Sequence, residues 1–357
     1  MRLSPETPYL FVDTDRLDRN LRSMAQWATE HHVLLRPHAK THKCAQIAQR
    51  QLDAGAVGLS VATIGEGEAF ADAGVDDLFI AYPLWLSEGK ARRLRALAGR
   101  VTLAVGVDSA DGARRLAAGL AGAPVRVLVE VDSGMHRSGV SADGAAEVAT
   151  VARDVGLDVV GVFTFPGHGY GPGTARTDAA GQEAAALAAA TAALRERGFT
   201  VSVVSGGSTP TVRLADPGVV TELRPGVYPF NDAQQLELGS ATVDDLALFA
   251  IATVVSRSGD RIVLDAGSKI LGADRPGWTT GFGRLPDHLD ARIVSLSEHH
   301  AVVEFPAGAT VPDLGDLVRA VPNHVCTAVN LVDELFAGSA HSDVLEVWPV
   351  IARGANS

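Results

Sequence analysis

The chain has 357 residues, a comfortable length for two domains, and 46% of these residues are hydrophobic while 20% are charged, so a packed core is expected. Acidic residues outnumber basic residues by 42 to 31, and the resulting formal net charge of -11 argues against nucleic acid as a partner. Two cysteines cannot form a disulfide framework, the first residues lack a signal-peptide pattern and no apolar run suits a membrane span, so we expect a soluble cytoplasmic protein that binds no membrane.

Short apolar runs alternate with longer helical patterns over roughly the first two thirds of the chain. Each run is apolar on both faces, as expected of a strand that is covered on both sides. The runs are 33–36, 58–62, 78–81, 101–105, 125–131, 159–163, 201–204 and 219–223. Helical patterns such as 87–97 and 179–197 lie between them, and glycines follow at 74, 99, 156 and 198, where helix ends are expected. Eight such alternations predict an α/β fold with a (β/α)8 TIM barrel.

The pattern changes after Leu238, where strand-like runs follow one another with little helix between them. These runs are 247–255, 261–264, 291–296, 301–305, 317–322 and 344–350. They predict a second, mainly antiparallel β domain. We place the barrel at 15–240 and this C-terminal domain at 241–357, together with residues 1–14. The segment 271–290 is too rich in Gly and Pro for regular structure and is expected to be a lid, a binding loop or a merely mobile loop.

Polar clusters follow several of the predicted barrel strands. A barrel of this kind carries its functional residues at the carboxyl ends of the strands. The clusters are 36–43, 132–139, 165–171, 205–210 and 224–228. We therefore expect a functional site to be assembled from these loops.

Two of these clusters indicate a phosphorylated cofactor. Ser205 to Thr209 form a Gly- and hydroxyl-rich turn whose backbone N–H groups suit an anion, although such turns are common without a ligand. Lys40 follows the first predicted strand. Lys40 is either a plain surface cation or, beside a phosphate site, the amine that forms a Schiff base with pyridoxal phosphate.

His324 and Cys326 form a candidate metal pair. In a strand, residues two positions apart share a face, so the imidazole and the thiolate would converge on one ion. These two ligand types favour zinc over magnesium, and two protein ligands leave open positions for catalysis. The alternative is a buried cysteine beside a histidine that caps a turn.

The sequence resembles the group of D-serine dehydratases and D-threonine aldolases. Its specific motifs are RPHAKTHK at 36–43 and PNHVC at 322–326, and the other polar clusters match the group more weakly. These proteins are fold-type III pyridoxal phosphate enzymes with an alanine-racemase-like barrel and a C-terminal β domain. The resemblance implies that Lys40 binds pyridoxal phosphate covalently and that Arg137 lies near the cofactor. It further implies that the phosphate is held by the turn of Ser205, Gly206, Gly207, Ser208 and Thr209, with Gly226 and Tyr228.

The resemblance also assigns roles in the reaction. His168 and Tyr170 belong to a turn that faces the cofactor in the group and are candidate catalytic residues. In the dehydratases the His-x-Cys pair binds zinc, whereas the aldolases more often present His-x-Asp. Cys326 therefore favours water elimination by a zinc-dependent lyase, with Mn²⁺ or Mg²⁺ as other possible ions. A homodimer is also implied.

The expected substrates are D-3-hydroxy amino acids, and D-serine dehydratase-like elimination to a 2-oxo acid and ammonia is the favoured reaction. The alternative is D-threonine aldolase-like cleavage to glycine and an aldehyde. A non-catalytic pyridoxal phosphate carrier would lack the β domain. A racemase of this fold takes its second base from a tyrosine of the β domain, and the sequence has no tyrosine after Tyr228.

Overall fold

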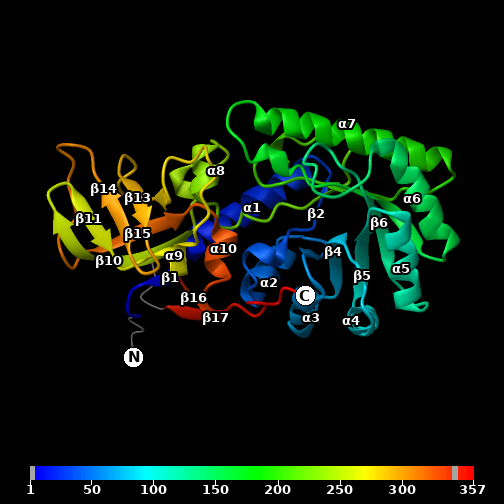
Figure 1. The fold of residues 1–357 in the computed structure, drawn as a ribbon, viewed down its shortest axis with the longest axis horizontal. Coiled ribbons are helices and arrows are strands. Elements are labelled where there is room, and N and C mark those ends of the chain that lie inside the picture. Colours follow the sequence, from blue (N-terminus) through cyan, green and yellow to red (C-terminus); the bar gives the residue numbers. More distant parts are fainter. Residues whose placement is uncertain (1–4, 340–344) are drawn as a thin grey trace. The chain divides into compact units, whose positions relative to one another are not determined.

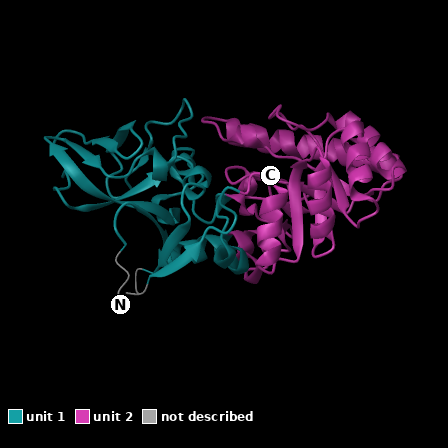
Figure 2. Ribbon diagram, turned by 60° about the horizontal axis from the view of Figure 1, so that its bottom comes forward, with its two compact units in different colours: residues 1–23, 41–50, 227–354 teal, residues 24–40, 51–226, 355–357 magenta. Residues whose placement is uncertain are grey.

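The computed structural model of the chain describes residues 5–339 and 345–357 (Figure 1). The chain divides into two compact units (Figure 2). Unit 1 comprises 1–23, 41–50 and 227–354, and unit 2 comprises 24–40, 51–226 and 355–357. Among the described residues, no helix is both long and apolar enough to cross a membrane.

Unit 2 contains a sheet of eight parallel strands in the order β2-β9-β8-β7-β6-β5-β4-β3. Its strands are β2 (Leu34–Leu35), β3 (Leu59–Val61), β4 (Asp77–Pro83), β5 (Thr102–Val107), β6 (Arg126–Glu130), β7 (Asp158–Phe163), β8 (Val203–Gly206) and β9 (Glu222–Leu223). The two ends of this order meet through a parallel bridge between His38 and Ser60, which curls the sheet round on itself. The predicted barrel of parallel strands is confirmed.

Helices alternate with these strands. They are α3 (Ile64–Asp72), α4 (Glu88–Ala98), α5 (Ala110–Leu120), α6 (Ala142–Asp154) and α7 (Ala175–Glu196). All of them except α7 begin at a capping Ser or Thr side chain. Ser87 and Ser141 each accept an N–H from the first turn of α4 and α6. Gly198 has φ +80 just after α7, whereas Gly99 has φ -78, so the end of α4 does not require a glycine.

The barrel interior is filled by side chains from neighbouring strands. Phe79 of β4 and Phe163 of β7 meet edge to face with their ring centroids 5.1 Å apart, and Ala104 and Leu128 complete this buried cluster. A packed interior leaves the ends of the barrel as the places where a ligand binds.

Unit 1 contains a nine-stranded sheet in which the only parallel pair among the described strands is β1 with β16. Its strands are β1 (Tyr9–Asp13), β10 (Leu248–Ser258), β11 (Arg261–Leu264), β12 (Gly283–Arg284), β13 (Arg292–Leu296), β14 (Ala301–Glu304), β15 (Leu317–Pro322), β16 (Glu334–Gly338) and β17 (Glu346–Pro349). The predicted, mainly antiparallel β domain is confirmed. The start of the run predicted at 344–350 lies outside the described residues.

Three short helices complete the described part of unit 1, and two longer helices span both units. The short helices are α8 (Ala233–Glu237), α9 (Ser268–Leu271) and α10 (Val325–Val329). The longer helices are α1 (Thr14–Glu30) and α2 (Ala45–Asp53), each of which begins in unit 1 and ends in unit 2.

Candidate active site

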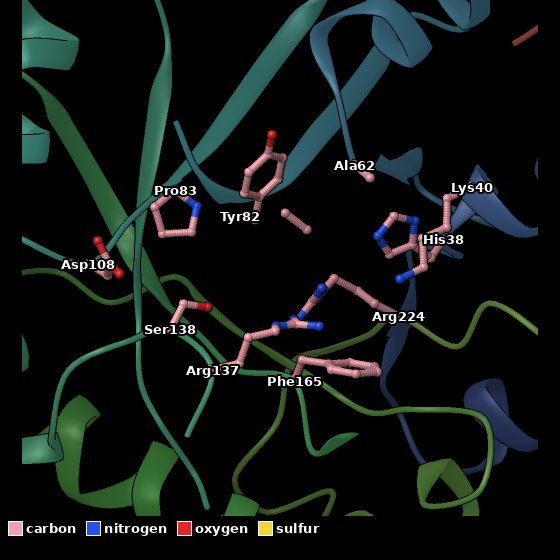
Figure 3. A pocket seen from close by; sticks show the side chains of 11 residues that line it. His38, Lys40, Ala62, Tyr82, Pro83, Asp108, Arg137, Ser138, Phe165 and Arg224 are labelled. Carbon is pink, nitrogen blue, oxygen red and sulfur yellow. The ribbon is translucent and has the colours of Figure 1, made fainter. Parts of the chain in front are cut away.

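A cavity of about 410 Å³ lies at the carboxyl end of the barrel in unit 2 (Figure 3). Its lining residues come from the ends of nearly all the strands. Four of the predicted polar clusters contribute to it, whereas the turn 205–210 contributes no lining residue. They are His38 and Lys40 after β2, Ala62 after β3, Ala81, Tyr82 and Pro83 of β4, Asp108 after β5, Arg137 and Ser138 after β6, Phe165 after β7, and Arg224 after β9.

Lys40 and Arg137 share one aromatic ring in this cavity. Lys40 lies in a short 3-10 helix, Ala39–Thr41, and its Nζ is 5.6 Å from the ring centroid of Phe165. The guanidinium carbon of Arg137 is 5.2 Å from the same centroid. Cations over an aromatic face are held by its quadrupole. The cavity therefore holds two positive side chains in defined positions, both of which the sequence analysis had selected.

Arg224 adds a third positive side chain, which is buried. Its Nε donates to Ser205 Oγ at 2.9 Å, and another guanidinium nitrogen donates to the carbonyl oxygen of Thr164. Burial lowers the pKa of Arg224, although the carboxyl groups of Glu222 and Glu183 oppose this effect. Sequence reasoning placed Arg224 after the last barrel strand but gave it no role.

The predicted phosphate turn begins at the end of β8, and several of its polar groups bond within the protein. Ser205 Oγ donates to Glu222 Oε1 at 2.7 Å, and the Gly207 N–H donates to Glu183 Oε1 at 2.6 Å. The hydroxyl groups of Ser208 and Thr211 are 2.9 Å apart. Ser205 also joins the turn to Arg224 of the cavity wall. These bonds hold the turn in place within the protein.

The remaining predicted residues of the phosphate site lie in different units. Thr209 and Tyr228 are buried, and Gly226 lies two residues after Arg224. Gly226 belongs to unit 2 and Tyr228 to unit 1. Their part in holding phosphate stays a prediction.

His168 and Tyr170 do not line the cavity of unit 2. His168 lies in the 3-10 helix Gly167–Gly169, and its Nε2 is 2.7 Å from Gln182 Oε1. The ring of Tyr170 is 6.5 Å from that of Phe165, which does line the cavity. Their catalytic roles remain predictions.

The candidate metal pair has a different local structure from the one expected. The strand assignment for His324 and Cys326 was wrong, because β15 ends at Pro322 and Cys326 lies in the first turn of α10. The helix begins there because Asp232 Oδ2 accepts the Val325 N–H at 3.3 Å and lies 3.2 Å from His324 Nδ1. The imidazole and the thiol nevertheless interact directly, now across the start of a helix.

Asp232 orients the pair and gives its surroundings a negative charge. It is fully buried, and its Oδ1 accepts the Gln235 N–H at 3.0 Å at the start of α8. Burial lowers the pKa of His324, but the Cys326 thiolate and Asp232 outweigh burial and raise this pKa well above its usual value. A positive charge is therefore stabilised at this position.

These features fit a divalent metal ion. Because His324 Nδ1 faces a carboxylate, Nε2 is the ring atom left for the thiol or for a metal, as in many metal-bound histidines. Cys326 Sγ lies 3.2 Å from the hydroxyl of Thr41, the residue that follows Lys40 in the sequence. Within the described ranges, no set of three or more His, Cys, Asp or Glu side chains is arranged to hold a metal. A metal held by these two side chains alone would keep positions open for water or substrate.

Sequence reasoning missed Asp232, although a signal for it exists. Asp232 precedes Gln235 by three positions, which is the spacing of a capping residue and the third residue of a helix. The spacing predicts the start of α8. It does not reveal that the same carboxylate holds a histidine far along the chain.

Comparison with known families identifies the fold and its relatives. The family model for the alanine racemase N-terminal domain matches residues 12–233, and a model for a serine dehydratase domain matches residues 247–337. The first match alone spans more than half of the chain. The chain belongs to the alanine racemase N-terminal domain family.

Relatives of this family member match nearly its whole length. A D-threonine aldolase of an Arthrobacter species is 35% identical over 98% of this chain and 93% of its own. The D-threo-3-hydroxyaspartate dehydratase of a Delftia species is 35% identical over 91% of this chain and 92% of its own. A 3-hydroxy-D-aspartate aldolase of Paracoccus denitrificans is 30% identical over 98% of this chain and 92% of its own.

Solved structures of such relatives share the fold of this chain over nearly its whole length. The D-threonine aldolase of Filomicrobium marinum superimposes with a TM-score of 0.86 at 33% identity, covering 98% of this chain and 96% of its own. The Delftia dehydratase gives 0.89 at 31% identity, with 97% of each chain covered. Its solved variants include a cysteine-to-alanine change in a metal-free form and a histidine-to-alanine change two positions earlier.

Proposed function

We propose that the chain is a pyridoxal phosphate- and metal-dependent lyase that acts on D-3-hydroxy amino acids. The observation that carries this proposal is the cavity at the carboxyl end of the barrel, where Lys40, Arg137 and Arg224 meet. The relatives, aldolases and dehydratases of such amino acids, support it.

The cavity suits the proposed cofactor in size and charge. About 410 Å³ lies within the usual range of pockets for small ligands. Three basic side chains complement an anionic cofactor, and Lys40 would hold it covalently. Pyridoxal phosphate, when bound, supplies an electron sink for a carbanion at the α-carbon of an amino acid.

The side chains of the cavity then have separate tasks. The amine of Lys40 is the base placed to hold the α-proton of the substrate. Phe165 fixes the positions of Lys40 and Arg137 through its ring face. Arg224 is held by Ser205 and keeps a positive charge in the cavity wall.

His324 and Cys326 would hold a divalent metal, and the thiolate favours zinc. A metal there would act as a Lewis acid on the substrate β-hydroxyl group. Asp232 would fix the orientation of the histidine ligand.

Water elimination is the reaction that we propose first. The Delftia dehydratase has variants at a histidine and a cysteine two positions apart, one of them metal-free, and this chain has the same spacing at His324 and Cys326. The second candidate is retro-aldol cleavage, which the match to a D-threonine aldolase over 98% of this chain favours.

Product analysis separates the two reactions. The purified protein would be supplied with pyridoxal phosphate and zinc and incubated with D-serine, D-threonine or D-threo-3-hydroxyaspartate. A 2-oxo acid with ammonia is expected for elimination, whereas glycine with an aldehyde identifies cleavage. L-serine and the Lys40→Ala variant are the controls. Turnover of none of the D-substrates would contradict the proposed function.

We further propose that the enzyme is a homodimer, as the resemblance implies. Light scattering on the eluted protein would measure its mass. A monomeric mass at the working concentration would contradict this proposal.

A further inference from the structure

Glu183 is a buried carboxyl group that the proposed reaction does not use. It lies on α7 and is only 1% exposed. Its Oε1 accepts the N–H of Gly207 at 2.6 Å, and among the described residues its Oε2 has no hydrogen-bond partner. A buried carboxyl oxygen without a hydrogen-bond donor destabilises the folded protein, and such groups are rare in proteins.

The turn of Ser205 to Thr209 is shaped around this carboxyl group. A Cβ atom at Gly206 would collide with Glu183 Oε1. Gly207 has φ +82, and a Cβ atom there would lie 2.8 Å from Leu223 Cδ2. The two glycines therefore allow Glu183 to approach the backbone of the turn closely and to orient the Gly207 peptide group.

The charges around Glu183 come from the neighbouring barrel strands. Burial raises the pKa of Glu183 to about 7, although the Gly207 N–H and the positive charge of Arg224 lower it. Arg224 also interacts electrostatically with Glu222 of β9 and Glu130 of β6, and Arg36 repels it. The positive charge of Arg224 therefore does not act on Glu183 alone. Because burial keeps the pKa of Glu183 at about 7, its carboxyl group changes charge close to neutral pH.

We propose that Glu183 positions the turn 205–209 and that binding of a phosphate group in this turn is coupled to uptake of a proton by Glu183. Phosphate and carboxylate are both negative, and they repel strongly where water is excluded. A neutral carboxyl group still accepts the Gly207 N–H through its carbonyl oxygen, so protonation removes the repulsion and keeps the turn in place. The inference uses the cofactor of the proposed function but not its reaction.

The coupling has a defined sign and size. Below the pKa of Glu183 the carboxyl group is already neutral, and phosphate binds without proton uptake. Above this pKa each pH unit weakens binding, so the dissociation constant of pyridoxal phosphate rises about tenfold between pH 6 and pH 8 through this group alone.

The test compares the wild type with Glu183→Gln, which is neutral at every pH and keeps the acceptor for Gly207. Dissociation constants of pyridoxal phosphate would be measured by absorbance at pH 6, 7 and 8. The ratio of the wild-type constant to the variant constant is expected to rise about tenfold over this range. The matched control is Glu196→Gln, which changes an exposed glutamate of the same helix and should show a constant ratio.

Pyridoxal is a further control, because it lacks the phosphate but can still react with Lys40. It therefore distinguishes an effect on phosphate binding in this turn from an effect on the lysine. Its wild-type-to-variant ratio should not change with pH. If pyridoxal shows the same change as pyridoxal phosphate, or if the pyridoxal phosphate ratio is flat, the proposal is overturned.

Calorimetry on the wild type keeps the proposal testable if Glu183→Gln does not fold. Titration with inorganic phosphate in two buffers of different ionisation enthalpy measures the protons taken up. Uptake well below one proton at pH 6, rising toward one at pH 8 beyond the titration of phosphate itself, is expected, and no excess uptake at pH 8 would refute the coupling. Because neither readout is turnover, a protein inactive on D-3-hydroxy amino acids would refute the proposed function alone.

Discussion

The barrel cavity and the start of α10 represent two ways of building a site. The cavity takes its side chains from loops after many parallel strands, and Lys40 and Arg137 are fixed by one shared ring. His324 and Cys326 lie within a single turn, and one buried carboxylate, Asp232, sets both the helix start and the histidine. The barrel cavity therefore depends on residues from many strands, whereas the arrangement of His324 and Cys326 depends on a single residue outside the pair, Asp232.

The difference predicts that cofactor and metal can be removed separately. Lys40→Ala should give the largest effect, because it removes the covalent anchor and the proton-holding amine, and turnover should fall by about 10³-fold or more. Loss of the absorbance of the cofactor bound covalently to Lys40 tests its role as the covalent anchor. Zinc affinity, measured by competition with a coloured chelator, should be unchanged. Turnover at the wild-type rate in this variant would show that another lysine serves the cavity.

Cys326→Ala should give the next largest effect. Loss of the thiolate should abolish zinc binding and lower turnover by roughly 100-fold, if Lewis-acid assistance contributes several kcal/mol. The absorbance of bound cofactor should stay as in the wild type. Cys326→Asp is the matched variant, because it offers an oxygen ligand and should shift the preferred ion toward manganese or magnesium. A fully active, metal-free Cys326→Ala protein would refute the metal site.

Asp232→Asn should give the smallest of the three effects. This variant tests whether Asp232 orients His324 for metal binding. The amide keeps the size of the side chain but removes its negative charge, so zinc affinity should fall by about 10- to 100-fold. Chelator competition measures this change, and cofactor affinity should not move. The control is Asp244→Asn, which changes an exposed aspartate in the short 3-10 helix Val243–Asp245 before β10. Unchanged zinc affinity in Asp232→Asn would show that the carboxylate only caps α8 and α10.

The barrel was predictable because its strands are buried on both faces and read as short apolar runs. Leu78 to Ala81 and Val159 to Phe163 are examples, and both lie within strands of the structure. Lys40 and Arg137 could then be placed in the cavity, because the carboxyl ends of parallel strands meet at one edge.

The local structure of the candidate metal pair was not predictable. Helix α10 has only five residues, too few to show a helical period, and it follows directly after a strand. Its start depends on Asp232, which lies 92 positions earlier in the sequence than His324. Glu183 was missed for a similar reason, because it lies within an Ala-rich helical pattern and only the fold shows that it meets Gly207.

The place of β1 in its sheet has a consequence for the order of synthesis. β1 lies between β10 and β16, with Phe11 opposite both Phe249 and Phe336. A ribosome makes β1 more than two hundred residues before either partner, while the strands of the barrel are completed in between. Such distant pairing is slow and leaves a strand edge exposed in the nascent chain. We expect this strand to need the protection of chaperones until β16 has emerged.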